Sequence, residues 1–177
     1  YNLMSQLVFK FPFKTKYYEQ DYYVSSNNFA AYRLIESWPN WPDKWVNIFG
    51  PKGSGKTHLS KILKKKINST QILNAEDLVN ETISKFGQLD CLIIDNYNEN
   101  IDEKTFYSTL NQCKQLDIYV VINSIFPIKD IGFDLKDLQS RAKSFMNLGI
   151  DLPTDDLLSV IISKFFSEKQ IEINPKI

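Results

Sequence analysis

Residues 50–57 read Gly-Pro-Lys-Gly-Ser-Gly-Lys-Thr, which matches the phosphate-loop pattern G-x-x-x-x-G-K-[ST] at every fixed position. The apolar run Trp-Val-Asn-Ile-Phe fills residues 45–49 just before it. Apolar residues recur at helical spacing just after it, at Leu59, Ile62, Leu63 and Ile67. An eight-residue match is also compatible with an ordinary glycine-rich turn. A strand before the loop and a helix after it favour phosphate binding, because the chemistry requires that context.

This loop predicts that the chain binds a nucleoside triphosphate. The glycines let backbone N–H groups point at the β-phosphate, Lys56 neutralises β- and γ-phosphate oxygens, and the Thr57 hydroxyl can ligate Mg²⁺. His58, the only histidine, is expected to pack or cap at the start of the helix rather than to catalyse. The residues predicted to bind the nucleotide here are Pro51, Lys52, Gly53, Ser54, Gly55, Lys56, Thr57 and His58.

Beyond the loop, short apolar segments alternate with helical patterns. Strands are expected at residues 71–73, 91–94, 118–122 and 145–148, and helices at residues 75–86, after an Asn74 cap, and around Phe106, Leu110 and Cys113. Continuous hydrophobicity within the strands indicates that both sheet faces are covered. The sequence therefore predicts an α/β fold, a parallel five-stranded sheet between helices.

A phosphate loop needs a second carboxylate at the end of an adjacent buried strand to hold Mg²⁺. Asp95 ends the run 91–94 and fits this role better than the alternative, a strand-end turn residue. Asn96 follows where most ATPases of this layout have an acid, and an amide can orient water but cannot take its proton. We therefore expect weak intrinsic ATP hydrolysis. Glu99 and Asp102 could replace the acid, although nothing in the sequence places either at the γ-phosphate.

Two further polar residues are candidate catalytic groups. Asn123 and Ser124 end the strand 118–122, where Asn123 would project its amide toward the γ-phosphate and the attacking water. In isolation, such an asparagine is usually a turn former. Arg141 ends a short helical stretch before the last strand and could reach a phosphate on a neighbouring subunit. The alternative for Arg141 is a solvated surface residue.

Composition narrows the class of protein. The 177 residues are 43% hydrophobic and 14% aromatic, which suits a folded chain of about one domain. Lys and Arg (21) balance Asp and Glu (21), so no overall field attracts nucleic acid or an anionic membrane. Cys91 and Cys113 lack metal-ligand spacing and are expected to be core thiols. No apolar run approaches the ~20 residues of a membrane span, and no secretion signal is present, so we expect a cytoplasmic protein.

Residues 154–169 predict one more helix. Thr154 can cap it, acidic residues occupy its first turn, and a wide apolar stripe follows. That stripe needs a partner, and few residues remain beyond it. The sequence is therefore expected to end partway into a helical lid subdomain, at residues 153–177.

Together these motifs resemble the AAA+ module of the replication initiator DnaA. The resemblance rests on Gly-Lys-Thr-His-Leu at residues 55–59, Ile-Ile-Asp-Asn at 93–96, Asn-Ser at 123–124 and Leu-Gln-Ser-Arg at 138–141. Within that branch the chain is most similar to Hda, the DnaA-related regulatory inactivator, in its alphaproteobacterial form. The Trp-Pro-rich run 38–42, Asp-Asn rather than Asp-Asp at the strand end, and an ATPase module that starts almost at once carry this finer resemblance.

The segment 6–11, Gln-Leu-Val-Phe-Lys-Phe, resembles the short motif by which replication proteins dock on the DNA polymerase III β sliding clamp. An extended peptide would place Leu7, Phe9 and Phe11 in an apolar clamp pocket, with Gln6 at its rim. The alternative is an edge strand that packs on the domain itself. We assign residues 1–15 to clamp docking and residues 16–152 to the AAA+ α/β subdomain.

The resemblance implies a regulator of chromosomal replication initiation. Docked on the clamp, it would present Arg141 to ATP bound on DnaA and stimulate hydrolysis there, while its own ATP or ADP with Mg²⁺ serves as a brace. Tyr23 and Val24 match the position where the family contacts adenine. Direct sequence-specific DNA binding is not expected, since DnaA's DNA-binding helices have no counterpart here, and a homo-oligomer is compatible with these features.

Some residues depart from the family pattern. Residues 125–127 read Ile-Phe-Pro where the family usually has Asp-Arg-Pro, which puts γ-phosphate sensing in doubt. A rival hypothesis is a self-hydrolysing AAA+ ATPase that acts as a replication-initiation or helicase-loading factor. A small-molecule kinase is a weaker third, because residues 124–140 contain no lid arginine.

Overall fold

The computed structural model describes residues 28–152 and Ser163. Its centre is a five-stranded sheet in the order β2-β3-β4-β1-β5, with every pairing parallel. The strands are β1 (Trp45–Phe49), β2 (Thr70–Asn74), β3 (Cys91–Tyr97), β4 (Tyr119–Ser124) and β5 (Met146–Gly149). Each strand expected from an apolar run is present, and the predicted α/β fold with a parallel five-stranded sheet is confirmed.

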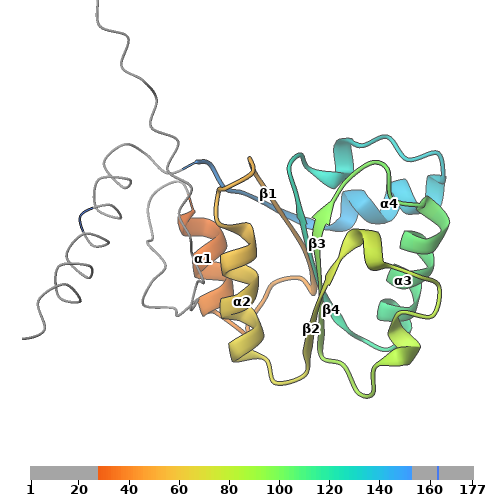
Figure 1. Cartoon of the computed structure of the whole chain (residues 1–177), viewed down its shortest axis with the longest axis horizontal. Coiled ribbons are helices and arrows are strands. Elements are labelled where there is room, and N and C mark those ends of the chain that lie inside the picture. The colour runs from red at the N-terminus through yellow and green to blue at the C-terminus, as the bar shows by residue number, and fades with distance from the viewer. Residues whose placement is uncertain (1–27, 153–162, 164–177) are drawn as a thin grey trace, which may run out of the picture.

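Helices cover both faces of this sheet (Figure 1). The helices are α1 (Phe29–Glu36), α2 (Lys56–Lys66), α3 (Glu103–Gln115) and α4 (Lys136–Ser144). α1 and α2 pack on one face and α3 and α4 on the other. The strands alternate accordingly, since Leu92 and Ile94 of β3 join the α3–α4 core while Ile93 joins the α1–α2 core. Apolar residues are therefore needed at consecutive positions of the central strands.

The two cysteines belong to these cores. Cys91 lies in β3 and Cys113 on α3, and both are buried free thiols. Burial raises the pKa of both thiols, that of Cys113 to about 12, so neither forms a thiolate readily. The prediction of core thiols is confirmed.

The connections of β1 and β4 create a site at one edge of the sheet. These strands are neighbours, yet β1 leads into α2 on one face and β4 leads toward α4 on the other. In open parallel sheets, ligands bind beside the carboxyl ends of the strands where the connections diverge in this way. The phosphate loop follows the carboxyl end of β1 and so lies at this position (Figure 1).

The prediction of a helix over residues 75–86 is wrong. The structure has two short 3-10 turns there, Ala75–Asp77 and Ile83–Lys85. Asn74 does cap the first, since its side chain accepts from the Glu76 N–H at 3.2 Å. The Thr82 hydroxyl then bonds both the N–H and the carbonyl of Val79, each at 2.8 Å. These side-chain bonds satisfy backbone groups locally and compete with a continuous helix.

Several expectations fall outside the described residues. These are the docking segment 6–11, the adenine contacts at Tyr23 and Val24, and the helix at residues 154–169. None of the helices within the described residues has both the length and the apolar character needed to span a bilayer.

Candidate functional site

The phosphate loop has the backbone that its glycines predict. Gly55 precedes α2 with φ 100°, and Gly53 lies in the same left-handed region at 84°. Other residues rarely adopt this region. Gly50 is required for another reason, because a Cβ there would collide with the carbonyl oxygen of Ile150. The loop is therefore fixed against the sheet at its start and opens onto the N-terminus of α2, where the N–H groups of the first turn lack helical partners.

Lys56 folds back over the loop. Its Nζ donates to the Gly50 carbonyl at 2.6 Å, the Pro51 carbonyl at 2.9 Å and the Ser54 hydroxyl at 3.3 Å. Burial lowers the pKa of Lys56, and the charge of Asp95 opposes that shift. A partly desolvated ammonium surrounded by neutral oxygens favours an anion nearby. Lys56 can therefore exchange these neutral acceptors for phosphate oxygens.

Asp95 is the point on which the site converges. Its Oδ2 accepts from the Thr57 hydroxyl at 2.8 Å, although 38 residues separate the two. Its Oδ1 accepts from the Asn123 amide at 3.1 Å and from the Asn96 backbone N–H at 3.0 Å. The side chain is 8% exposed. The structure thus brings together the phosphate-loop threonine and the strand-end aspartate that the sequence predicts as metal-holding residues.

The chemistry of this pair fits Mg²⁺. A hydroxyl and a carboxylate oxygen are the hard ligands that Mg²⁺ prefers, and this ion usually takes one or two protein ligands and completes its shell with phosphate and water. Among the described residues there is no group of three or more His, Cys, Asp or Glu side chains that could hold a metal ion. Thr57 and Asp95 would hold Mg²⁺ together with a nucleotide rather than in its absence.

Asn123 lies deeper than expected. The sequence places its amide at the γ-phosphate, but in the structure this side chain is fully buried. Its Nδ2 donates to Asp95 and, at 2.7 Å, to the hydroxyl of Ser60. Its Oδ1 has no hydrogen-bond partner among the described residues. Asn123 thus holds the Asp95 carboxylate from the buried side, and its contact with the nucleotide stays a prediction.

Asn96 occupies an irregular point of β3. Its φ is 55°, and the register with β4 shifts between Ile94 and Tyr97. Asparagine is among the few residues that tolerate this left-handed region, and such bulges are frequent beside active sites. The Asn96 side chain is exposed at the carboxyl edge of the sheet.

Of the two acids that could replace a catalytic carboxylate at Asn96, one is already engaged. Asp102 caps α3 and accepts from the Thr105 N–H and hydroxyl, each at 2.9 Å. These bonds lower the pKa of Asp102. Glu99 is exposed two residues beyond β3. Asp102 is therefore a structural cap rather than a general base.

The sequence reasoning missed two supporting residues. Ser60 carries the Asn123 contact, and its position four residues after Lys56 was the available signal. Asn47 is buried in β1, where its Nδ2 donates to Ser124 Oγ at 2.9 Å and its Oδ1 accepts from the Ile128 N–H at 2.9 Å. A lone asparagine in an apolar strand was the signal for this second contact. Both residues hold the end of β4 beside the loop.

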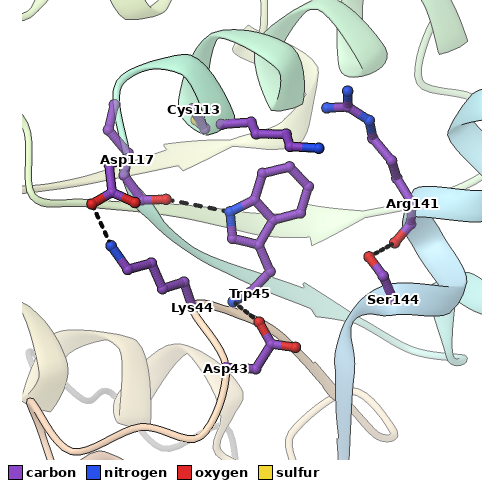
Figure 2. A pocket seen from close by; sticks show the side chains of 9 residues that line it. Asp43, Lys44, Trp45, Cys113, Asp117, Arg141 and Ser144 are labelled. Carbon is purple, nitrogen blue, oxygen red and sulfur yellow. Dashed lines mark hydrogen bonds and ion pairs between the residues drawn. The ribbon is translucent and has the colours of Figure 1, made fainter.

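Arg141 lies away from the phosphate loop, in a different pocket. This pocket is about 330 Å³ in volume (Figure 2). Its wall includes Trp45 at the amino end of β1 and Ile118 just before β4, so it opens at the amino edge of the sheet. The phosphate loop is at the carboxyl edge, a strand length away, about 16 Å for the five residues of β1. Arg141 therefore lies at the opposite edge of the sheet from the nucleotide site of its own chain.

Aromatic rings surround the Arg141 guanidinium. Its Cζ lies 5.0 Å from the ring centroid of Tyr107 and 5.9 Å from that of Trp45. Nη1 is buried without a hydrogen-bond partner among the described residues. The side chain as a whole is partly buried. It is thus neither a freely solvated surface residue nor a member of the core.

Comparison with solved structures finds the same architecture in replication proteins. Domain III of the Thermotoga maritima replication initiation protein DnaA matches with a TM-score of 0.66 and 18% identity, over 90% of this chain and 77% of that chain. The chain has the α/β fold of DnaA domain III. AMPPCP-bound DnaA from Aquifex aeolicus matches with a TM-score of 0.64 and 20% identity over 89% of this chain. DnaI matches with a TM-score of 0.54 and 16% identity, over 73% of this chain and 84% of that chain.

The similarity lies in structure rather than in sequence. The chain spans 56% of the length of the Aquifex DnaA chain. No protein-family model matches the sequence, and the search of curated proteins finds no match. The comparisons therefore establish the α/β fold alone, which this chain shares with both DnaA and DnaI.

Proposed function

We propose that this chain is a DnaA-related AAA+ regulator of replication initiation that binds an adenine nucleotide with Mg²⁺ at its phosphate loop. The AMPPCP-bound DnaA of the same fold supports adenine as the base. The Lys56 and Thr57 contacts support a site for the phosphates, and the bond from Thr57 to Asp95 supports Mg²⁺. When bound, Mg²⁺ would neutralise phosphate charge.

The nucleotide is proposed to act mainly as a brace. Asn96 stands where an acid would activate water, and Asp102 is engaged at the start of α3. An amide in place of a general base would forgo a contribution of about 10²- to 10⁴-fold to hydrolysis. A slowly hydrolysed nucleotide keeps Lys56, Thr57 and Asp95 assembled and so maintains one conformation of the domain.

The observation that carries the regulatory half of the proposal is the position of Arg141. It lies at the opposite edge of the sheet from the phosphate loop, in a pocket open at the amino ends of β1 and β4. A strand length of about 16 Å separates this pocket from the phosphate loop, which favours an action of Arg141 on another molecule over an action on its own nucleotide. We propose that this neighbour is DnaA with bound ATP, and that Arg141 stabilises charge that develops during hydrolysis there.

Clamp docking completes the proposal. Segment 6–11 would place its leucine and phenylalanines in the β sliding clamp and so concentrate the chain on replicating DNA. Support for this part comes from the sequence motif alone.

The test is DnaA-dependent ATP hydrolysis in the presence of clamp loaded on DNA. Arg141→Ala should abolish stimulation while nucleotide affinity and clamp binding stay unchanged. Gln6→Ala with Leu7→Ala should abolish clamp binding and leave nucleotide affinity unchanged. Full stimulation by Arg141→Ala would show that another residue acts on DnaA, and unaltered clamp binding by the double variant would remove the docking step.

The second candidate function is a self-hydrolysing helicase-loading or initiation factor, which the fold shared with DnaI favours. Steady-state turnover by the isolated chain distinguishes the two. A rate well above about one per minute that Asp95→Ala abolishes would support this second function. A slow rate that Asp95→Ala barely changes would support the regulator.

A further inference from the structure

We propose that Trp45 and Tyr107 form an aromatic cradle that positions the Arg141 guanidinium for use by a neighbouring molecule. The inference deepens the proposed function, since it rests on Arg141 acting on a nucleotide bound elsewhere. The cradle joins three elements, because Trp45 begins β1, Tyr107 lies on α3 and Arg141 on α4. Figure 2 shows the indole of Trp45 in the middle of the pocket with the Arg141 side chain beside it.

The two rings attract the guanidinium without neutralising it. Their centroids lie 5.9 Å and 5.0 Å from Cζ, within the distance over which an arginine interacts with an aromatic face. A ring contact leaves the in-plane N–H donors of the guanidinium available for phosphate oxygens. A carboxylate partner would instead take up both the charge and the donors.

The acids that line the same pocket are engaged elsewhere. Asp117 forms an ion pair with Lys44, and Asp43 accepts from the Trp45 backbone N–H at 3.4 Å. Among residues 28–152, no carboxylate forms an ion pair with Arg141. The pocket thus holds a full positive charge on Arg141 with no internal counter-ion within ion-pair distance.

The cradle rings are themselves fixed. The indole N–H of Trp45 donates to the Ile118 carbonyl at 3.3 Å, and its ring lies 5.2 Å from that of Phe145. Tyr107 is partly buried and packs against the core between α3, α4 and the sheet. Rings held in this way restrict the rotamers of a long side chain that would otherwise lose much entropy on binding.

The accessible N–H groups of the guanidinium are those that a neighbouring molecule can meet. Nη1 is buried without a hydrogen-bond partner among the described residues, whereas Arg141 as a whole is only partly buried. The acceptor that the proposed function supplies for the accessible donors is a phosphate oxygen of a nucleotide on the neighbouring molecule. Trp45 and Tyr107 are therefore positioning residues that act through Arg141.

The full chain offers an unusually clean measurement, because it contains only two arginines, Arg33 and Arg141. Labelling with ¹³C,¹⁵N-arginine gives two guanidinium signal sets in NMR spectra, and Arg33 is the internal reference. The Arg141 side-chain signals should show ring-current shifts that Tyr107→Leu changes and Tyr107→Phe retains, while the Arg33 signals stay in place. The cradle would be overturned if the Arg141 side chain had the chemical shifts of a solvent-exposed arginine and Tyr107→Leu did not change them.

Stimulation of DnaA hydrolysis then tests the positioning role. Tyr107→Leu should lower the maximal stimulated rate about tenfold without changing the half-saturating concentration, and Tyr107→Phe should restore it. Trp45→Leu, paired with Trp45→Phe, repeats the comparison if Tyr107→Leu loses its folded circular-dichroism spectrum. A full maximal rate for both leucine variants would overturn the positioning role.

These readouts separate failure of the cradle from failure of the proposed function. If Arg141→Ala still stimulates DnaA fully, the proposed function is wrong, and with it the positioning role, whatever the NMR result. If Arg141→Ala abolishes stimulation but the Arg141 signals ignore both leucine variants, the proposed function stands and the cradle is wrong.

Discussion

Asp95 connects the parts of the proposed nucleotide site. Its two oxygens accept from Thr57 on α2, from Asn123 on β4 and from the Asn96 backbone in β3. A carboxylate held by three donors from three elements is fixed in orientation before any metal arrives. Such preorganisation lowers the cost of assembling a metal site.

This arrangement predicts a loss of Mg²⁺-dependent affinity in Asp95→Ala. The affinity for ADP in Mg²⁺ should fall at least about tenfold, a size typical of residues that support a metal site. Affinity in EDTA should change little, because Lys56 and the loop backbone are intact. Isothermal titration calorimetry in both buffers measures the difference, and Glu99→Gln at the same sheet edge is the control. Equal losses in Mg²⁺ and EDTA would contradict a metal role.

Lys56 predicts a pH dependence. Burial lowers its pKa, so its ammonium deprotonates at a lower pH in the folded chain than in the unfolded chain. The free energy of unfolding should increase with pH between the lowered and the ordinary lysine pKa, because the unfolded chain binds more protons in this range. Nucleotide affinity should decrease over the same range, since the phosphates need the charged form of Lys56.

ADP affinity should therefore weaken as pH rises through the alkaline range below the ordinary lysine pKa. Lys56→Arg keeps its charge throughout this range and should show a flat profile. Fluorescence titrations from about pH 7.5 to about pH 10, below the ordinary lysine pKa of about 10.4, provide the measurement. A flat wild-type profile would contradict the lowered pKa.

Among the secondary-structure elements, those with continuous apolar patterns are predictable from the sequence. The strands were expected because each shows an apolar run, and α2 and α3 because their apolar residues recur at helical spacing. Residues 75–86 also showed helical spacing, but Thr82 bonds the backbone of Val79 and divides the segment. Such local competition depends on side-chain geometry that hydrophobic spacing does not encode.

The same distinction applies to the candidate site. The loop, Thr57 and Asp95 were predictable because their spacing and strand context reflect one chemistry. Asn47, Ser60 and the buried position of Asn123 were not, because the contacts Asn47–Ser124 and Ser60–Asn123 join residues that are 77 and 63 positions apart in the sequence. Long-range polar contacts of this kind depend on the sheet order, which the sequence pattern leaves open.

Phe106 is one of the fully buried residues by which α3 packs on the sheet. This ring is fully buried and lies 4.4 Å from the ring of Tyr97 on β3. Phe106→Ala should lower the free energy of unfolding by about 3–5 kcal/mol through lost contacts and a cavity. Urea unfolding measures the change, and exposed Lys104→Ala on the same helix should stay within about 0.5 kcal/mol of wild type. A loss below about 1 kcal/mol would show that the surrounding core collapses around the gap.

In the molecule as a whole, the two chemically distinct sites lie at opposite edges of one sheet. The phosphate loop follows the carboxyl end of β1, and the Arg141 pocket includes Trp45 at the amino end of the same strand. The proposed function uses one edge for the chain's own nucleotide and the other for contact with another molecule. Contacts of this head-to-tail kind are heterologous, and they do not require a second copy of the same chain.

A single-turnover experiment with two labels tests this arrangement. The chain is loaded with ATP that carries one phosphorus isotope and DnaA with ATP that carries another, and the two are mixed on clamp-bearing DNA. The label on DnaA should convert to ADP, at a rate that Arg141 raises by about 10³- to 10⁵-fold, while the label on this chain persists. Conversion of the chain's own label first, with the DnaA label intact, would contradict the proposed division between a retained nucleotide and an arginine that acts in trans.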